Sequence, residues 1–191
     1  MRQIFEKYNY KPKSIFVQQG GLTLRFESAN IHFFMSKTLY LMRHGQAMDG
    51  HPDFNRELTD KGMRDARKQG LNVFLDEIPD RFLVSTAIRT SQTVAHLREE
   101  LRFNEKIVQF EASMYNAAIR ELFELVTNLD NLWLNVCLIG HNPSITYLAE
   151  FLTGDNVGYV NPAGIVKMRI DGSWAEVTQG GAYFEFYRAS E

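Results

Sequence analysis

Cysteine is nearly absent from this chain of 191 residues, which contains only Cys137. One cysteine excludes an intramolecular disulfide and any metal site built from several thiolates. Cys137 lies in the apolar run 135–139, where we expect a buried and unreactive thiol. Long apolar runs are also missing, since none approaches the roughly 18 to 20 residues that span a bilayer. We therefore expect a cytoplasmic protein with no membrane partner.

The chain also lacks an excess of either charge. It has 21 basic and 23 acidic residues, and its formal net charge is −2. This balance argues against general binding to nucleic acid or to a membrane surface. The hydrophobic share of 45% and the charged share of 23% are ordinary for a globular protein. The length is enough for one domain with a substantial core.

The first 34 residues differ from the rest of the chain. They lack the positive-then-apolar order of a secretory signal. Met35 leads within three residues into an apolar run, as a natural start would. We therefore expect residues 1–34 to be an N-terminal extension outside the native domain and residues 35–191 to form that domain. In the alternative interpretation, Gly20 and Gly21 turn a hairpin between residues 14 and 27.

From residue 37 onwards, strand patterns alternate with helix patterns. Apolar runs predict strands at residues 38–42, 82–85, 107–110, 136–139, 165–170 and 183–187, and helical spacing predicts helices at 61–75, 88–101, 118–128 and 143–152. Thr59 and Asp60 can cap the first helix. Asn142 can cap the last one, with Pro143 in its first turn, and Gly154 ends it. This alternation predicts a three-layer α/β/α sandwich with a mostly parallel central sheet.

Three polar clusters directly follow predicted strands: Arg43-His44-Gly45, Ser85 to Arg89, and Gly140-His141-Asn142. The carboxyl ends of parallel strands share one edge of the sheet, where ligands bind in open α/β folds. Arginine presents a planar fork that matches phosphate oxygens, and neutral imidazole is a nucleophile that can hold a covalent intermediate. The clusters therefore indicate phosphoryl chemistry. Zinc ligation by the two histidines fits less well, because two arginines oppose a cation.

Four segments, in order, resemble the motifs of the histidine phosphatase superfamily, the phosphoglycerate mutase-like group. The segments are residues 39–47, 56–62, 85–93 and 136–143. The short chain and the Gly-His-Asn-Pro sequence resemble its SixA-type phosphohistidine phosphatase subgroup. Glu57 and Thr86 depart from the usual prolines of the motifs, at positions that are structural in the family. The resemblance implies a phosphoglycerate mutase-like fold.

The resemblance also implies roles for individual residues. His44 corresponds to the phosphoryl-accepting nucleophile. The phosphate pocket is implied to consist of Arg43, Arg89 and His141. Gly45 and Asn142 are implied at the substrate-binding surface, and Arg56 fits either its edge or a plain surface salt bridge. No metal or other cofactor is implied.

The proton donor of the reaction is the least defined part of the resemblance. Glu111 is a candidate, although a solvated carboxylate at a strand edge fits this residue better. Asp49 and Asp53 are weaker candidates, and Tyr115 fits a pocket lining and a core position equally. SixA-type proteins typically lack a clear acid, and the leaving group of a phosphoramidate needs less help than an alcohol. This absence favours phosphohistidine as the substrate.

We therefore expect a metal-independent phosphatase that acts through a phosphohistidine intermediate on His44. The expected substrate is phosphohistidine of a protein, such as a histidine phosphotransfer domain, or a small phosphomonoester. A mutase of the same superfamily is an alternative, but the chain is short and lacks the usual insertions. A non-catalytic phosphate-binding module is a second alternative, which the presence of both histidines opposes.

Overall fold

The computed structural model describes residues 36–190, which contain one six-stranded sheet in the order β3-β2-β4-β1-β5-β6. The strands are β1 (Lys37–Arg43), β2 (Arg81–Ser85), β3 (Val108–Glu111), β4 (Asn135–Gly140), β5 (Ile165–Ile170) and β6 (Ala182–Arg188). The four strands β1, β2, β3 and β4 are parallel to one another, whereas β5 and β6 pair antiparallel to their neighbours. The expected, mostly parallel α/β sheet is confirmed. The extension predicted for residues 1–34 lies outside the described residues.

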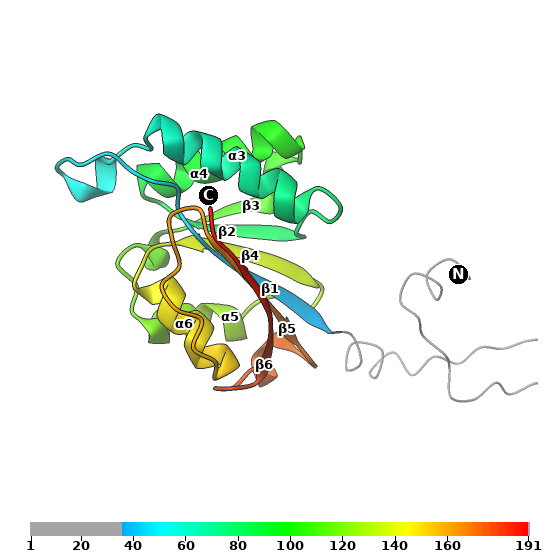
Figure 1. Cartoon of the computed structure of the whole chain (residues 1–191). Helices are drawn as coiled ribbons and strands as arrows, with labels where there is room; N and C mark the ends of the chain where they lie inside the picture. The colour runs from blue at the N-terminus through cyan, green and yellow to red at the C-terminus, as the bar shows by residue number, and fades with distance from the viewer. Residues whose placement is uncertain (1–35, 191) are drawn as a thin grey trace, which may run out of the picture. The chain divides into compact units, whose positions relative to one another are not determined.

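Helices cover both faces of this sheet. α3 (Asp60–Phe74) and α4 (Ile88–Leu101) lie on one face, and α5 (Ile119–Thr127) and α6 (Ser144–Thr153) lie on the other (Figure 1). Four short 3-10 segments occupy connections: η2 (Asp53–Asn55), η3 (Glu105–Ile107), η4 (Ala112–Met114) and η5 (Trp174–Glu176). The three-layer arrangement agrees with the alternation of strand and helix patterns in the sequence.

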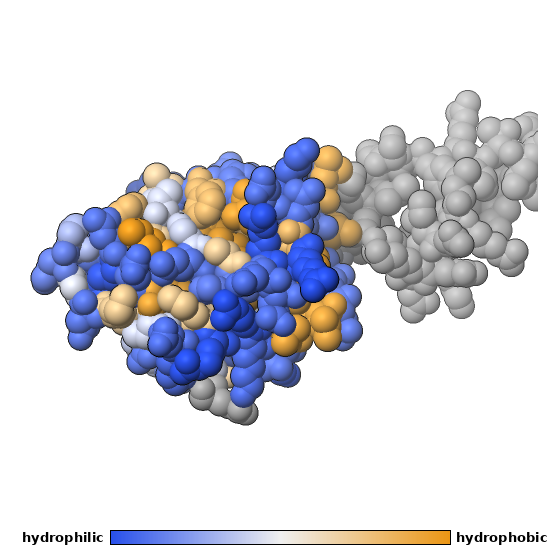
Figure 2. Space-filling model, turned by 90° about the horizontal axis from the view of Figure 1, so that it is seen from above, coloured by the Kyte–Doolittle hydropathy of each residue, from blue (hydrophilic) through white to orange (hydrophobic). Residues whose placement is uncertain are grey.

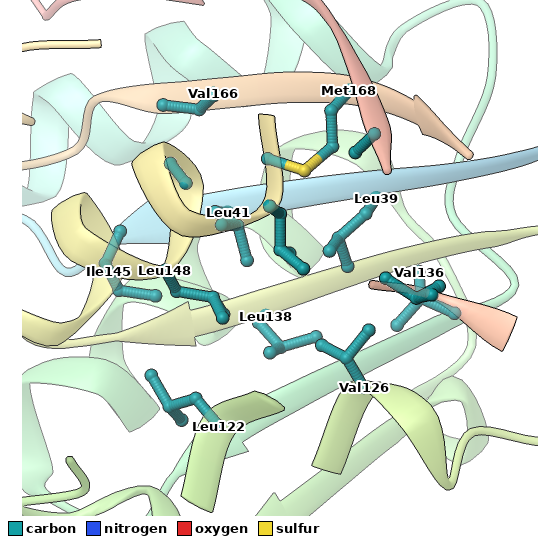
Figure 3. Close-up of a cluster of buried hydrophobic side chains, with 14 of the residues drawn as sticks. Leu39, Leu41, Leu122, Val126, Val136, Leu138, Ile145, Leu148, Val166 and Met168 are labelled. Carbon is teal, nitrogen blue, oxygen red and sulfur yellow. The ribbon is translucent and has the colours of Figure 1, made fainter. Parts of the chain in front are cut away.

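The central strand β1 contributes to two hydrophobic cores, one on each face of the sheet. Successive side chains of a strand point to opposite faces. Leu39 and Leu41 therefore pack with side chains of α5 and α6, as Figure 3 shows, whereas Tyr40 and Met42 pack towards α3 and α4. Each of the four is at most 2% exposed. Full burial of a leucine side chain contributes about 1.5–3 kcal/mol, so both layers of helices are held to the sheet by its apolar faces.

Two helix ends occur where the sequence indicates them. Thr59 is the N-cap of α3, and its hydroxyl accepts a hydrogen bond from the Gly62 amide at 3.0 Å. Gly154 follows α6 with φ of 74°, a left-handed conformation that glycine adopts without a steric penalty.

The expected start of α6 is wrong. The helix begins at Ser144, and Asn142 does not cap it. The Asn142 amide instead donates to the Val160 carbonyl oxygen at 2.9 Å and accepts from the Thr146 hydroxyl at 3.1 Å. The side chain therefore ties the β4–α6 connection to a distant loop and is not available for the backbone of its own helix.

The outer surface on the α3 and α4 side is mostly hydrophilic, with hydrophobic residues scattered among polar ones (Figure 2). Cys137 is fully buried, and burial raises the pKa of its thiol, so the thiol is held in its neutral form. Within residues 36–190, no helix is both long and apolar enough to cross a membrane.

Candidate active site

Three parallel strands bring the polar clusters to one edge of the sheet. β1 and β4 pair so that Arg43 lies opposite Gly140, and β2 ends nearby at Ser85. The rings of His44 and His141 are consequently 5.2 Å apart between centroids. Arg89, the second residue of α4, donates from Nε to Nε2 of His44 at 3.2 Å. Residues 45 or more positions apart in the sequence thus form one site.

His44 is buried, at 8% exposure, and its hydrogen bonds define its tautomer. Its Nδ1 lies 2.7 Å from the Gly45 carbonyl oxygen, and Arg89 Nε donates to its Nε2. A carbonyl oxygen only accepts and a guanidinium only donates, so the proton is on Nδ1 and the lone pair is on Nε2. Burial lowers the pKa of His44 to about 3, and the charges of His141, Arg89 and Arg43 lower it as well. The hydrogen bond to the Gly45 carbonyl raises the pKa but does not offset these effects. The imidazole is therefore neutral near pH 7.

His141 is the second neutral imidazole of the site. Its Nε2 is 2.8 Å from the Ser85 hydroxyl, and its buried Nδ1 has no hydrogen-bond partner among the described residues. Burial, followed by the charge of Arg89, lowers the pKa of His141 to about 4, although Asp53 opposes the shift. A buried nitrogen without a partner is costly unless a ligand or water satisfies it. His141 is therefore equipped to contact a polar ligand.

Arg43 lies beside the two histidines and is anchored on one side only. Its Nη1 donates to the Tyr159 hydroxyl at 2.8 Å and to the Val160 carbonyl oxygen at 3.1 Å. The guanidinium also lies 5.0 Å from the centroid of the Tyr159 ring. Its buried Nε has no partner in the described part of the chain. An anion bound at this site could therefore accept a hydrogen bond from Nε of the positively charged Arg43.

Asp53 occupies the remaining donors of Arg89. Arg89 Nη1 donates to the Asp53 carbonyl oxygen at 2.7 Å, and Nη2 donates to the carboxylate Oδ2 at 3.0 Å. Tyr115 also donates to Oδ2 at 3.0 Å, and Arg56 donates to Oδ1 at 3.1 Å. Partial burial raises the pKa of Asp53, but these hydrogen bonds and the charge of Arg89 outweigh it and lower the pKa to about 2. Asp53 is therefore an ionised internal partner of Arg89, without a proton to donate in this state.

Two glycines allow the loop after His44 to pack against the start of α3. A Cβ on Gly45 would lie 2.7 Å from the Gly62 carbonyl oxygen, and a Cβ on Gly62 would lie 2.2 Å from the Gln46 carbonyl oxygen. The Gly45 amide donates to the Thr93 hydroxyl at 3.0 Å, and Thr93 lies one turn after Arg89 on α4. The first three motifs are thus joined through backbone contacts that a larger residue would break.

Two other predicted site residues, Arg56 and Glu111, form bonds with groups other than His44. Arg56 donates to the Met48 carbonyl oxygen at 2.6 Å and lies 3.7 Å from the exposed Asp49, so it stabilises its own loop as well as Asp53. Glu111 accepts a hydrogen bond from Gln109 of the same strand at 2.5 Å. The described residues include no hydrogen bond or ion pair between Glu111 and the groups around His44. The structure therefore does not bring Glu111 into this cluster.

Sequence reasoning missed the roles of Ser85 and Thr93. Ser85 holds the ring of His141, and Thr93 holds the loop at Gly45. Their positions carried a signal, because Ser85 ends a predicted strand and Thr93 is four residues after Arg89, on the same side of a helix. Tyr115 belongs at the site too: besides its bond to Asp53, its ring lies 5.8 Å from that of His141.

The described residues contain no candidate metal site. In residues 36–190, no three His, Cys, Asp or Glu side chains are placed so that they could hold a metal ion.

Comparison with known proteins gives matches among solved structures. The chain is 26% identical to a putative phosphohistidine phosphatase SixA from Nakamurella multipartitia, over 81% of this chain and 96% of that one, with a TM-score of 0.68. It is 22% identical to the protein histidine phosphatase SixA complexed with tungstate, over 80% and 97%, with a TM-score of 0.69. A mycobacterial glucosyl-3-phosphoglycerate phosphatase has 16% identity over 81% and 100%, with a TM-score of 0.65. No family model and no curated protein sequence matches.

The fold of this chain, with its order of strands and its cluster around His44, is similar to that of solved histidine phosphatase structures. Three of these similar structures are SixA proteins, the group that the four sequence motifs resemble. The neighbours with this architecture are phosphatases, which agrees with the expected class of enzyme, a phosphoric monoester hydrolase.

Proposed function

We propose that this protein is a phosphohistidine phosphatase that transfers the phosphoryl group to Nε2 of His44 and then to water. We further propose that its substrate is phosphohistidine on another protein. The resemblance to SixA proteins supports the reaction class, and the complex of one SixA with tungstate, a phosphate-like oxyanion, supports an anion site in this fold.

One observation carries the proposal: the lone pair of His44 Nε2 lies within a cluster of cationic donors. The Nδ1–H bond to Gly45 orients the ring, and Arg89 Nε lies 3.2 Å from the lone pair. Burial keeps the ring neutral near pH 7, so Nε2 is unprotonated and accepts only the Arg89 hydrogen bond, which a phosphoryl group would replace. A neutral imidazole is a competent nucleophile, whereas an imidazolium is not.

The chemistry consists of two displacements at phosphorus. In the first, the substrate ring takes a proton from solvent on its free nitrogen, Nε2 of His44 forms a bond to phosphorus, and the phosphorus–nitrogen bond of the substrate breaks, which releases a neutral imidazole. In the second, water attacks phosphorus, the bond to Nε2 breaks, and inorganic phosphate leaves. The water protons end on the products, and His44 regains its lone pair. Pre-placed cations stabilise the charge of the transferring group in both steps.

The state of the acidic groups favours phosphohistidine over an alkyl phosphate. Asp53, the carboxylate bound to Arg89, is ionised, and Glu111 pairs with Gln109. An alcohol leaving group needs a positioned acid, whereas the imidazole of phosphohistidine departs more readily. The absence of a positioned acid among the described residues therefore supports a phosphoramidate substrate.

The proposal assigns roles by contact. Arg43 and His141 bind the phosphoryl oxygens through nitrogens that have no partner among the described residues. Arg89 binds them by exchanging its present bonds to His44 and Asp53. Gly45 positions the loop, Arg56 holds Asp53, and Asn142 holds the β4–α6 connection through Val160. We place this activity in the cytoplasm, in keeping with a single, buried thiol.

The test compares wild-type protein with His44→Ala in the presence of a chelator. The substrates are a generic aryl phosphate and a phosphorylated histidine phosphotransfer domain. We expect His44→Ala to lose at least about a thousandfold in rate, the scale for losing a nucleophile. His51→Ala, which removes an exposed histidine seven positions away, is the matched control and should retain activity.

Each outcome separates the proposal from its alternatives. Phosphate release by His44→Ala at the wild-type rate would overturn the proposed mechanism. Phosphate binding without turnover would identify a binding module instead. Transfer between phosphoglycerates with a bisphosphate primer, without release of phosphate, would identify a mutase.

A further inference from the structure

The loop between β1 and α3 leaves the body of the domain and returns to it at a common base. Ala47 and Leu58 form an isolated antiparallel bridge, and the Thr59 amide donates to the Gln46 carbonyl oxygen at 2.9 Å. Leu58 is 1% exposed, whereas none of residues 48–57, the η2 loop, is buried. In Figure 1 this loop, in cyan, projects from the end of the domain. The base is therefore anchored in the core, and the tip depends on other contacts.

The tip of the η2 loop is held over the active site by two of its residues. Asp53 accepts from Arg89 through its carbonyl oxygen at 2.7 Å and through Oδ2 at 3.0 Å, and the Tyr115 hydroxyl donates to the same Oδ2. The ring of Phe54 packs edge-on against that of Tyr115, with 5.0 Å between the centroids. Among residues 36–190, no other hydrogen bond or ion pair joins the η2 loop to the rest of the domain.

Asp53 competes with a phosphoryl group for Arg89. The neighbouring donors of a guanidinium are the pair Nε and Nη2 and the pair Nη1 and Nη2. Nε of Arg89 is bonded to His44, and Nη1 and Nη2 are both bonded to Asp53. Each pair thus includes a nitrogen that Asp53 occupies. The pKa of Asp53 is about 2, so its carboxylate is negative near pH 7 and repels a second anion at this place.

The η2 loop has its own internal brace in Arg56. Arg56 donates from Nε to the Met48 carbonyl oxygen at 2.6 Å and from Nη1 to Asp53 Oδ1 at 3.1 Å. Both partners belong to the loop, so these bonds do not oppose its movement away from the domain. Asp53 therefore keeps a cationic partner when it leaves Arg89, and its charge is not left unpaired.

We propose that the η2 loop is a lid, which Asp53 holds closed on Arg89 and which opens when a phosphoryl group takes the place of the Asp53 carboxylate. The phosphoryl oxygens bind Arg89, the ring contact between Phe54 and Tyr115 breaks, and the loop turns about its base. This inference rests on the proposed function, since it needs a phosphoryl group in the active site, and it adds a conformational step. Closure lowers the apparent affinity for phosphate, because only the open form binds it.

Amide hydrogen exchange with and without saturating inorganic phosphate tests the lid. The amides of Asn55 and Arg56 form the single turn of η2 with the Pro52 and Asp53 carbonyl oxygens. A lone turn is not stable away from the surface on which it packs. We expect phosphate to speed exchange of these two amides at least about threefold, whereas a ligand that only adds contacts slows exchange. The Thr59 amide at the base is the internal control and should not exchange faster.

Phe54→Ala loosens the lid without changing Arg89 or His44. We expect phosphate to bind this variant about threefold more tightly in calorimetry, the scale for losing one aromatic pair that favours the closed form. The amides of the η2 turn should exchange fast even without phosphate. Phe184→Ala is the matched control, because Phe184 on β6 is similarly exposed, at 40% against 37% for Phe54. It should match wild type in both measurements.

Slower or unchanged exchange of the η2 turn with phosphate bound would overturn the lid, because Asp53 would then stay on Arg89 and only orient that side chain. Equal or weaker phosphate binding by Phe54→Ala would overturn it as well, while leaving the phosphatase proposal intact. If wild-type protein bound no phosphate, the anion site of the proposed function would fail and the lid with it, which is a distinguishable result.

Discussion

Acidification from pH 7.5 to pH 5 should destabilise the native protein through the buried His44. Its pKa is about 3 in the folded protein and 6.5 when unperturbed. Between these two values the unfolded chain binds a proton that the native state excludes, so stability falls as the pH falls through this window. At pH 5, about 1.5 pH units below the unperturbed value, the loss from His44 is about 2 kcal/mol. Because the side chain is only 8% exposed, solvent screening reduces this value little.

The assay is urea unfolding at pH 7.5 and pH 5 for wild-type protein and His44→Asn. The difference in unfolding free energy between the two pH values should be about 2 kcal/mol smaller in His44→Asn than in wild type. His141 is present in both proteins, so its own contribution cancels to first order. His51→Asn replaces an exposed histidine in the next loop and should behave as wild type. An equal loss in His44→Asn and wild type would refute the argument that burial keeps this imidazole neutral.

Arg89→Ala should lower kcat about 100- to 1,000-fold, because it removes the donor at His44, and an unchanged kcat would exclude Arg89 from the site. Asp53→Asn removes the internal anion on Arg89, so inorganic phosphate should inhibit about fivefold more tightly. Asp49→Asn is the control, and weaker inhibition of Asp53→Asn would contradict the prediction. Gly62→Ala should lower the unfolding free energy by about 1–3 kcal/mol, whereas Gly50→Ala, with nothing within 4 Å, should not.

Local signals were sufficient to predict most of the sheet and helices. Thr59 caps α3 and Gly154 ends α6, because a hydroxyl acceptor and a left-handed residue act within one turn. Asn142 failed as a cap because its amide bonds to Val160, which is 18 residues away. The antiparallel direction of β5 and β6 could not be predicted either, since an apolar run indicates a strand without giving its direction.

The site shows the same division between local and long-range information. His44, Arg89 and His141 were brought together by a topological argument, because parallel strands end at one edge. The bond between Asp53 and Arg89 joins residues 36 positions apart and depends on the fold of the irregular loop that contains Asp53, which has no periodic pattern to interpret.

The phosphoenzyme itself is the most direct test of the central claim. Wild-type protein is mixed rapidly with a radiolabelled, phosphorylated histidine phosphotransfer domain and quenched in alkaline detergent, in which phosphohistidine survives. We expect a transient label that mass spectrometry locates on His44 and that is chased into inorganic phosphate, with no label in His44→Ala. A label on another residue, or turnover by wild-type protein through a route that His44→Ala retains, would contradict the assignment of His44 as the nucleophile.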